Sequence, residues 1–209
     1  MRKKNWNRKI FAGLISLTIF ILPLNILKTD QNEIKLPETK QWSKVEKRCK
    51  NLKATGNFTY PQNIKGAILV TKDNLTGLVP FVGHAAIVLN SRQVVQASPF
   101  GGVHYGPNDW DTSKITCYAA IPKNTTEKDR IASANWAQKQ IGKCYNVFFN
   151  LWKNPRAKSF YCTQLIWAAY YNSCKLDIAP DNPFILFPVD LLTNPRITNL
   201  IYYKDSAYD

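Results

Sequence analysis

The chain has 209 residues, and its 28 Lys and Arg against 14 Asp and Glu give it a formal net charge of +14. This length suits one domain plus an N-terminal targeting segment, and the hydrophobic fraction of 45% is ordinary for a packed core. The basic excess is scattered, and no clustered stripe or named nucleic-acid motif accompanies it. These features argue against nucleic acid as a partner.

The first 30 residues have the composition of a membrane-targeting segment. Five Lys and Arg residues precede an apolar run over residues 10–27. This pattern is typical of a secretory signal peptide or a signal anchor. The sequence does not distinguish a cleaved signal peptide from a signal anchor. No small-x-small cleavage site follows the apolar run, and the length of the run is borderline for a membrane-spanning helix. We expect an extracytoplasmic protein, secreted or anchored to the membrane by residues 1–30. The remaining chain keeps a net charge of +9, which favours attraction to an anionic envelope.

The rest of the chain predicts a mixed fold. Residues 31–62 are polar and Lys-rich, which predicts a tether with a short helix before a domain at 63–209. Asn124 and Glu127 have capping-box spacing for a helix closed by Gly142. The predicted strands are 63–71, 84–89, 93–98, 115–121 and about 200–203, and a second helix begins at Cys162. Hairpins followed by helices indicate an α+β fold with an antiparallel sheet packed against helices.

Cys162 is the candidate nucleophile. Five cysteines leave at least one thiol unpaired, and the sequence has no C-x-x-C pair and no close Cys/His pair, so no metal site is predicted. Cys162 begins the helix that follows Tyr161, and the positive end of a helix stabilises a thiolate. The competing interpretation is a buried structural thiol, because cysteine packs as a small hydrophobe.

His84 and Gln96 fall on one hairpin. If Asn90–Arg92 form its loop, paired positions sum to 182, and His84 and Gln96 share one face. Gln96 can then accept a hydrogen bond from the imidazole and fix its tautomer. A hydrogen-bonded core histidine and a half-exposed polar residue are the alternatives. His104, in a predicted Gly-rich loop, is expected at the surface or in contact with substrate.

Five ordered motifs carry a resemblance to a known family. They are Gly-Ala-Ile-Leu-Val-Thr (66–71), Gly-His-Ala-Ala-Ile-Val (83–88), Val-Val-Gln-Ala (94–97), Ile-Gly-Lys-Cys-Tyr-Asn (141–146) and Tyr-Cys-Thr-Gln-Leu-Ile (161–166). Together they resemble the permuted papain-like hydrolases of the YaeF/YiiX type, relatives of the NlpC-type wall peptidases. The resemblance runs from about residue 64 to residue 193.

The resemblance implies a permuted papain-like fold with the catalytic cysteine at a helix N-terminus. Cys162 matches the nucleophile and His84 the base. Gln96 stands where the family usually has a glutamate as the third polar residue. Tyr145 matches an aromatic residue near the site and, besides His104, is the other expected substrate contact.

These observations predict an exported or membrane-anchored thiol hydrolase that cleaves an amide by a Cys-His mechanism and needs no metal or cofactor. The expected partner is an envelope substrate, a wall peptide or a lipid or acyl group, with the membrane bound through the N-terminal segment. Two alternatives stay open: a lipid- or acyl-acting hydrolase or acyltransferase of the same fold, and a catalytically inactive envelope-binding module.

Overall fold

The computed structural model describes residues 37–54, 59–73, 83–148, 153–180 and 185–205. The chain divides into two compact units, Met1–Ile34 and Lys35–Asp209, and everything described below belongs to the second. The expected signal or anchor at 1–30 therefore lies outside the described residues. No helix within the described ranges has both the length and the apolar character needed to cross a membrane.

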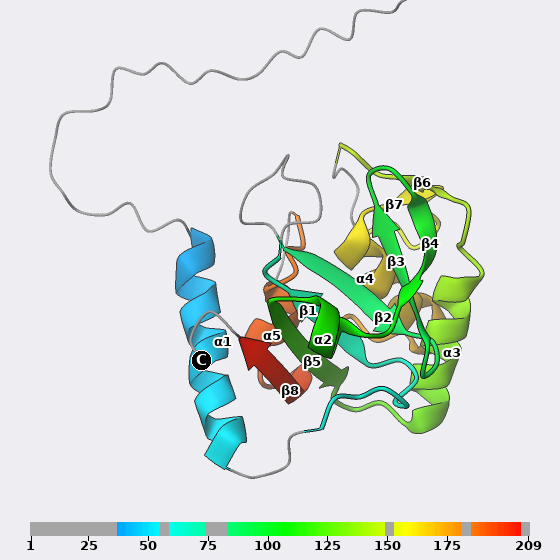
Figure 1. Cartoon of the computed structure of the whole chain (residues 1–209). Helices are drawn as coiled ribbons and strands as arrows, with labels where there is room; N and C mark the ends of the chain where they lie inside the picture. Colours follow the sequence, from blue (N-terminus) through cyan, green and yellow to red (C-terminus); the bar gives the residue numbers. More distant parts are fainter. Residues whose placement is uncertain (1–36, 55–58, 74–82, 149–152, 181–184, 206–209) are drawn as a thin grey trace, which may run out of the picture. The chain divides into compact units, whose positions relative to one another are not determined.

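The second unit is a mixed α+β structure whose main sheet is antiparallel (Figure 1). The strand order in this six-stranded sheet is β4-β3-β2-β1-β5-β8, and a separate parallel pair joins β6 to β7. The strands are β1 (Ile68–Thr71), β2 (His84–Val88), β3 (Gln93–Ser98), β4 (Gly102–Pro107), β5 (Thr116–Pro122), β6 (Cys144–Tyr145), β7 (Ser159–Phe160) and β8 (Thr198–Asp205). The helices are α1 (Pro37–Ala54), α2 (Trp110–Ser113), α3 (Glu127–Gln138), α4 (Cys162–Cys174) and α5 (Asp190–Thr193).

The two faces of the sheet bury different sets of side chains. One face carries Ile68, Ala85 and Ile87 and packs against the long helices in the larger core cluster. In Figure 1, α4 lies behind the strands on this side, and α3 lies beside them at the right of the view. The opposite face carries Ala86 and Val88 and is covered by Trp110 and other aromatic residues in a smaller cluster. The sheet is therefore buried on both faces near β2.

The predicted hairpin register is confirmed. Ala86 pairs with Gln96 and Val88 with Val94, so the paired positions sum to 182 as expected. Asn90 holds the turn, because its side-chain oxygen accepts the backbone N–H groups of Arg92 and Gln93. The hairpin that carries the candidate base is thus specified by its own loop.

Other local expectations differ from the structure. The capping box of α3 uses Thr126 and Asp129, and Asn124 instead adopts a positive φ of 58° before the helix. The stretch around His104, expected as a loop, is strand β4. Within 31–62, α1 is an 18-residue helix that buries Val45 in the core, longer than the short helix of the expected tether.

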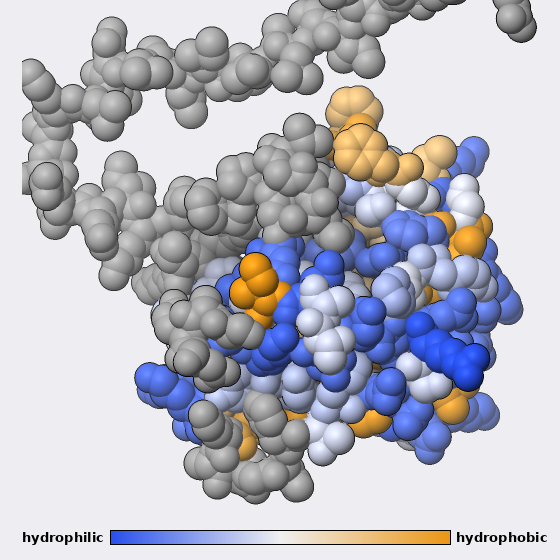
Figure 2. Space-filling view, viewed as in Figure 1, coloured by the Kyte–Doolittle hydropathy of each residue, from blue (hydrophilic) through white to orange (hydrophobic). Residues whose placement is uncertain are grey.

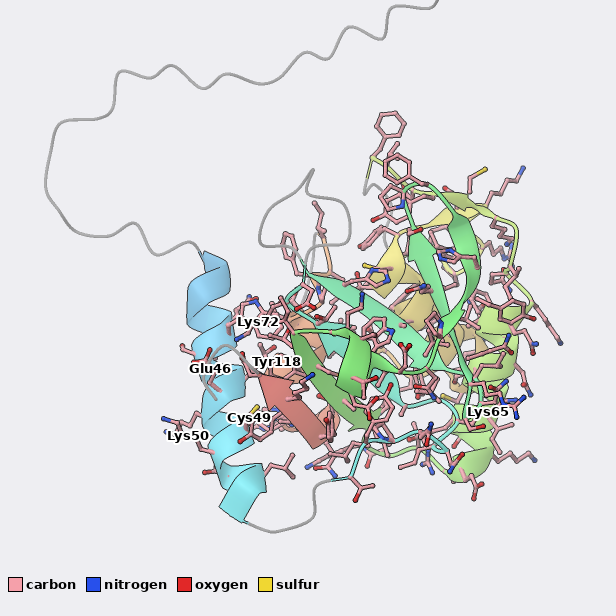
Figure 3. All side chains as sticks on the ribbon, viewed as in Figure 1. Glu46, Cys49, Lys50, Lys65, Lys72 and Tyr118 are labelled. Carbon is pink, nitrogen blue, oxygen red and sulfur yellow. The ribbon has the colours of Figure 1, made fainter. Side chains whose placement is uncertain are left out.

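A charged cluster holds α1 against the sheet (Figure 3). Lys72 lies 2.8 Å from Asp205 and 3.3 Å from Glu46 of α1, and its ammonium sits 5.1 Å from the centre of the Trp42 ring. The Tyr118 hydroxyl donates to the same Asp205 carboxylate at 2.7 Å. Because the Asp205 side chain is only 9% exposed, water does little to stabilise its charge. The carboxylate therefore depends on Lys72 and its other partners in this cluster.

We expect Lys72→Met to lower the free energy of unfolding by about 2 kcal/mol, because it leaves the Asp205 carboxylate buried without its cation. The matched control is Lys153→Met, which breaks a more exposed 3.0 Å pair with Asp177 and should cost under about 1 kcal/mol. Urea denaturation of both variants measures the difference. Equal losses would show that the Lys72 cluster contributes no more than a surface pair.

Candidate functional site

Cys162 occupies the first position of α4, and local hydrogen bonds fix that turn. The Gln164 side-chain oxygen accepts the Tyr161 backbone N–H at 3.3 Å and the Asn146 amide at 3.1 Å. The Thr163 hydroxyl donates to the Leu186 carbonyl. All of these side chains are buried, so the start of the helix and the cysteine on it are rigidly placed.

The Cys162 sulfur lies where β2 and β3 separate. Alternate N–H groups of an antiparallel strand point to opposite neighbours, and the Leu89 N–H donates to Gln93 of β3. The Ala85 N–H therefore also points toward β3, but the β2–β3 pairing ends at Ala86. The Ala85 N–H instead faces the Cys162 thiol closely enough to lower its pKa. The thiol thus lies beside the peptide that directly follows His84.

Burial dominates the acidity of this thiol. It raises the pKa of Cys162 to about 11, and the backbone N–H groups of Ala85, Thr163 and Cys162 itself only partly oppose it. The expectation of a helix-stabilised thiolate therefore differs from the structure of the resting protein. The helix terminus does supply N–H donors, but the desolvation of a side chain that is 6% exposed outweighs them.

His84 projects from the opposite side of β2 to α4, beside the smaller core cluster. Its Nε2 atom lies 2.8 Å from Gln96 Oε1, and its ring lies 5.7 Å from that of Trp110. Gly83 has a φ of +70°, and a Cβ there would lie 2.3 Å from the Thr71 carbonyl oxygen. A glycine is therefore needed directly before the histidine for β2 to begin where it does.

A chain of three hydrogen bonds fixes the tautomer of His84. His104 Nδ1 lies 3.0 Å from the Gly102 carbonyl, which only accepts, so Nδ1 carries a proton. With the His104 proton on Nδ1, Nε2 of the same ring accepts from the Gln96 amide nitrogen, 3.2 Å away. The Gln96 oxygen is consequently the atom that faces His84, and it accepts the His84 Nε2–H. This relay leaves the lone pair of His84 on Nδ1.

The His84 ring is neutral at neutral pH. Burial lowers its pKa to about 4; the hydrogen bond to Gln96 opposes the shift, and Lys114 and His104 lower the pKa further. Thiol and imidazole are both in their uncharged forms in the resting protein. Within the described residues, no hydrogen bond joins the His84 ring to the Cys162 sulfur.

Tyr145 lies in the electrostatic neighbourhood of Cys162. β6 pairs with β7 so that Tyr145 is opposite Phe160, two residues before the cysteine. Burial, together with the nearby Cys162 and Tyr161, raises the pKa of the Tyr145 phenol. The phenol is therefore protonated and available as a donor. The structure thus brings Tyr145 near the thiol and places His104 on the relay behind Gln96, while their predicted contacts with substrate stay predictions.

Two elements of the site were not predicted from the sequence. His104 was not expected to bond Gln96; the alternation of β4 that pairs His104 with Gln96 is the signal that could have found it. Gly106 makes room for the relay, since a Cβ there would lie 2.3 Å from the Gln96 amide nitrogen. All five cysteines are free thiols, and the described residues hold no group of three or more His, Cys, Asp or Glu placed to bind a metal.

No family model matches this chain. One curated relative is the uncharacterized protein YycO of Bacillus subtilis (strain 168), which is 22% identical over 152 residues. That match covers 71% of this chain and only 60% of YycO. Among solved structures, the chain is similar to the one titled metalloprotein yiiX from Escherichia coli O157:H7, with a TM-score of 0.50 and 16% identity. The match spans 66% of this chain and 97% of yiiX. Both findings agree with the YaeF/YiiX resemblance, and the structural likeness establishes the fold alone.

The burial of His84 predicts a specific dependence of stability on pH. Its pKa is about 4 in the folded protein and about 6.5 when unfolded, so the unfolded chain binds the extra proton between these values. Stability should therefore fall as the pH drops from about 6.5 to about 4, with a slope approaching 1.4 kcal/mol per pH unit from this group. His84→Gln, which retains a hydrogen-bonding side chain, should flatten the slope in urea denaturation. The same slope in both proteins would mean that His84 is not buried in the neutral form.

Proposed function

We propose that this protein is a thiol hydrolase with a permuted papain-like site, in which Cys162 attacks a carbonyl carbon and His84 is the base. The observation that supports this most is the relay from the Gly102 carbonyl through His104 and Gln96. It leaves the lone pair on His84 Nδ1, while the thiol lies beside the N–H of the next residue. Nucleophilic catalysis by a thiol requires a base with a free lone pair that can come within reach of the sulfur, and the relay supplies that lone pair.

The uncharged resting state determines the order of proton transfer. The neutral thiol gives its proton to His84 Nδ1 as sulfur bonds to the substrate carbonyl, so the ion pair forms during attack. The imidazolium then protonates the leaving amine or alcohol, and a thioester remains on Cys162. Water, deprotonated by the same imidazole, releases the acid and restores the thiol. The missing His84–Cys162 hydrogen bond agrees with this order, since such bonds often tighten only when substrate binds.

Two groups are suited to stabilise the oxyanion. The backbone N–H of Cys162 lies at the positive end of α4. The Tyr145 phenol, kept protonated by burial and by the neighbouring thiol, is the second donor. Gln96 and His104 have no contact with the carbonyl in this scheme; they orient the base.

The substrate class follows from the proposed location. An N-terminal signal or anchor would place the domain outside the cytoplasm, where wall-peptide amides and lipid or acyl-group carbonyls are the available substrates. The solved neighbour is titled a metalloprotein, but the described residues of this chain offer no three-ligand group for a metal. The proposed steps use only side chains and water.

We expect His84→Ala to slow alkylation of Cys162 by iodoacetamide at pH 7 at least about tenfold, because removing the base leaves a thiol of high pKa. Site-resolved mass spectrometry measures the rate at each cysteine. Cys144 is exposed and provides the internal control, so its rate should be the same in both proteins. An unchanged Cys162 rate would contradict the proposed pair and favour a catalytically inactive binding module.

Gln96 provides a second test through the pH profile. In Gln96→Glu, a carboxylate beside His84 stabilises the imidazolium and raises its pKa, so His84 stays protonated to higher pH. The acid limb of kcat/KM, measured as release of p-nitrophenol from an activated ester, should move upward from near pH 4 toward neutrality. Gln96→Ala should lower the rate by a smaller factor than His84→Ala does, because its role is orientation. An unshifted acid limb in Gln96→Glu would show that His84 is not the base.

A further inference from the structure

Three large apolar side chains lie exposed at one end of the described unit. Phe100 is 84% exposed, Phe148 is 81% exposed and Val147 is 55% exposed. We call these three residues the apolar tip. The strands beside them are packed normally, since Val103 of β4 and Asn146, which directly precedes Val147, are buried. The exposure therefore belongs to the tip itself and not to a loosely folded region.

The tip comes from two segments that the fold holds side by side. Phe100 lies in the turn between β3 and β4, and Val147 and Phe148 follow β6. The Val103 N–H donates to the Lys143 carbonyl at 2.8 Å, and the Gly142 N–H donates to the Val103 carbonyl at 2.9 Å. Figure 2 shows apolar residues projecting together at the end where Figure 1 labels β4 and β6.

A close backbone approach keeps these two segments in place. Gly102 has a φ of +58°, and a Cβ at this position would lie 2.2 Å from the Lys143 carbonyl oxygen. Only glycine allows that contact, so the hairpin turn is pressed against the strand that leads to Phe148. Two phenyl rings held outward on a rigid support contribute nothing to the core, and such exposed apolar groups usually mark an interaction surface.

The charged residues on the strands that lead to the tip are basic. Lys143 directly precedes β6, and Lys158 directly precedes β7, with which β6 pairs. Lys158 and Arg156 are exposed, and residues 93–107, which include Phe100, contain no charged residue. Protruding aromatic side chains with basic residues on the adjoining strands fit an anionic lipid surface, where the rings enter the headgroup region and the cations meet lipid phosphates.

The tip also lies on the segments that form the candidate site. The turn with Phe100 joins the strand of Gln96 to the strand of His104, and Phe148 follows Tyr145 by three residues. We propose that the apolar tip docks this domain onto a bilayer bearing anionic headgroups, with the site facing the lipid surface. This surface is separate from the N-terminal segment and does not depend on whether Cys162 is reactive.

The test places a reporter at the tip of the full chain. In Phe148→Trp, the added indole should have blue-shifted emission on vesicles of phosphatidylglycerol and phosphatidylcholine. Its added emission should be lost when the phosphatidylcholine is replaced by a dibrominated form that quenches on contact. Ile115→Trp is the matched control, because Ile115 is 63% exposed but lies before β5, away from the tip. Emission added at Ile115 should stay unquenched.

Two outcomes overturn the proposal. One is quenching at position 148 that does not exceed quenching at position 115, which would mean that only the N-terminal segment touches lipid. The other is equal quenching on vesicles of neutral phosphatidylcholine alone, which would remove the role of the basic residues. Neither readout uses the thiol, so the result is independent of the alkylation and ester assays.

Discussion

The site depends on the point at which the pairing of β2 with β3 ends. In an uninterrupted ladder the Ala85 N–H would bond to β3; here the pairing stops at Ala86, and this N–H lowers the pKa of the Cys162 thiol instead. The start of α4 and the strand that carries the histidine therefore meet at this point. His84 projects toward the smaller cluster, and α4 covers the other face of the sheet.

The polar side chains behind His84 are paired, as buried polar groups usually are. The relay ends on the Gly102 carbonyl, which only accepts, so His104 carries its proton on Nδ1; with His104 Nε2 as an acceptor, each of the two earlier bonds then has one direction. Gly106 and Gly83 contribute by having no side chain, one leaving space for the Gln96 amide and the other allowing β2 to begin at His84. The backbone thus specifies the protonation of the base.

Much of this arrangement follows from the sequence and some of it does not. The register of the β2–β3 hairpin, the shared face of His84 and Gln96, and the helix that starts at Cys162 follow from turn chemistry and from periodicity, which are local properties. The bond between Gln96 and His104 depends on pairing β4 with β3, and Pro99 and the two glycines of that turn read as a loop in the sequence. A sequence pattern that indicates a loop does not reveal which residues of the next strand pair with β3.

The acidity of the thiol could not be predicted for a related reason. The helix dipole is a local property that favours the thiolate, but desolvation depends on everything packed around the side chain. The same holds for α1: its apolar residues were visible, but the Lys72 cluster that binds it combines residues from four distant segments. Where neighbours far apart in sequence determine the pKa or the partners of a side chain, the sequence pattern can identify the residue. Its protonation state and its contacts follow only from the fold.

The glutamine at position 96 suits the state that burial imposes on the pair. A carboxylate here would be partly desolvated and would need the His84 imidazolium as its partner, which favours an ion pair at rest. A neutral amide makes no such demand, so the ring stays neutral with its lone pair on Nδ1 throughout the neutral pH range. The amide also donates to His104, which an ionised carboxylate cannot do. Glutamine in place of glutamate at position 96 therefore changes the step at which the Cys162–His84 ion pair forms. The pair forms during attack and not in the resting protein, while the orientation of the His84 ring is retained.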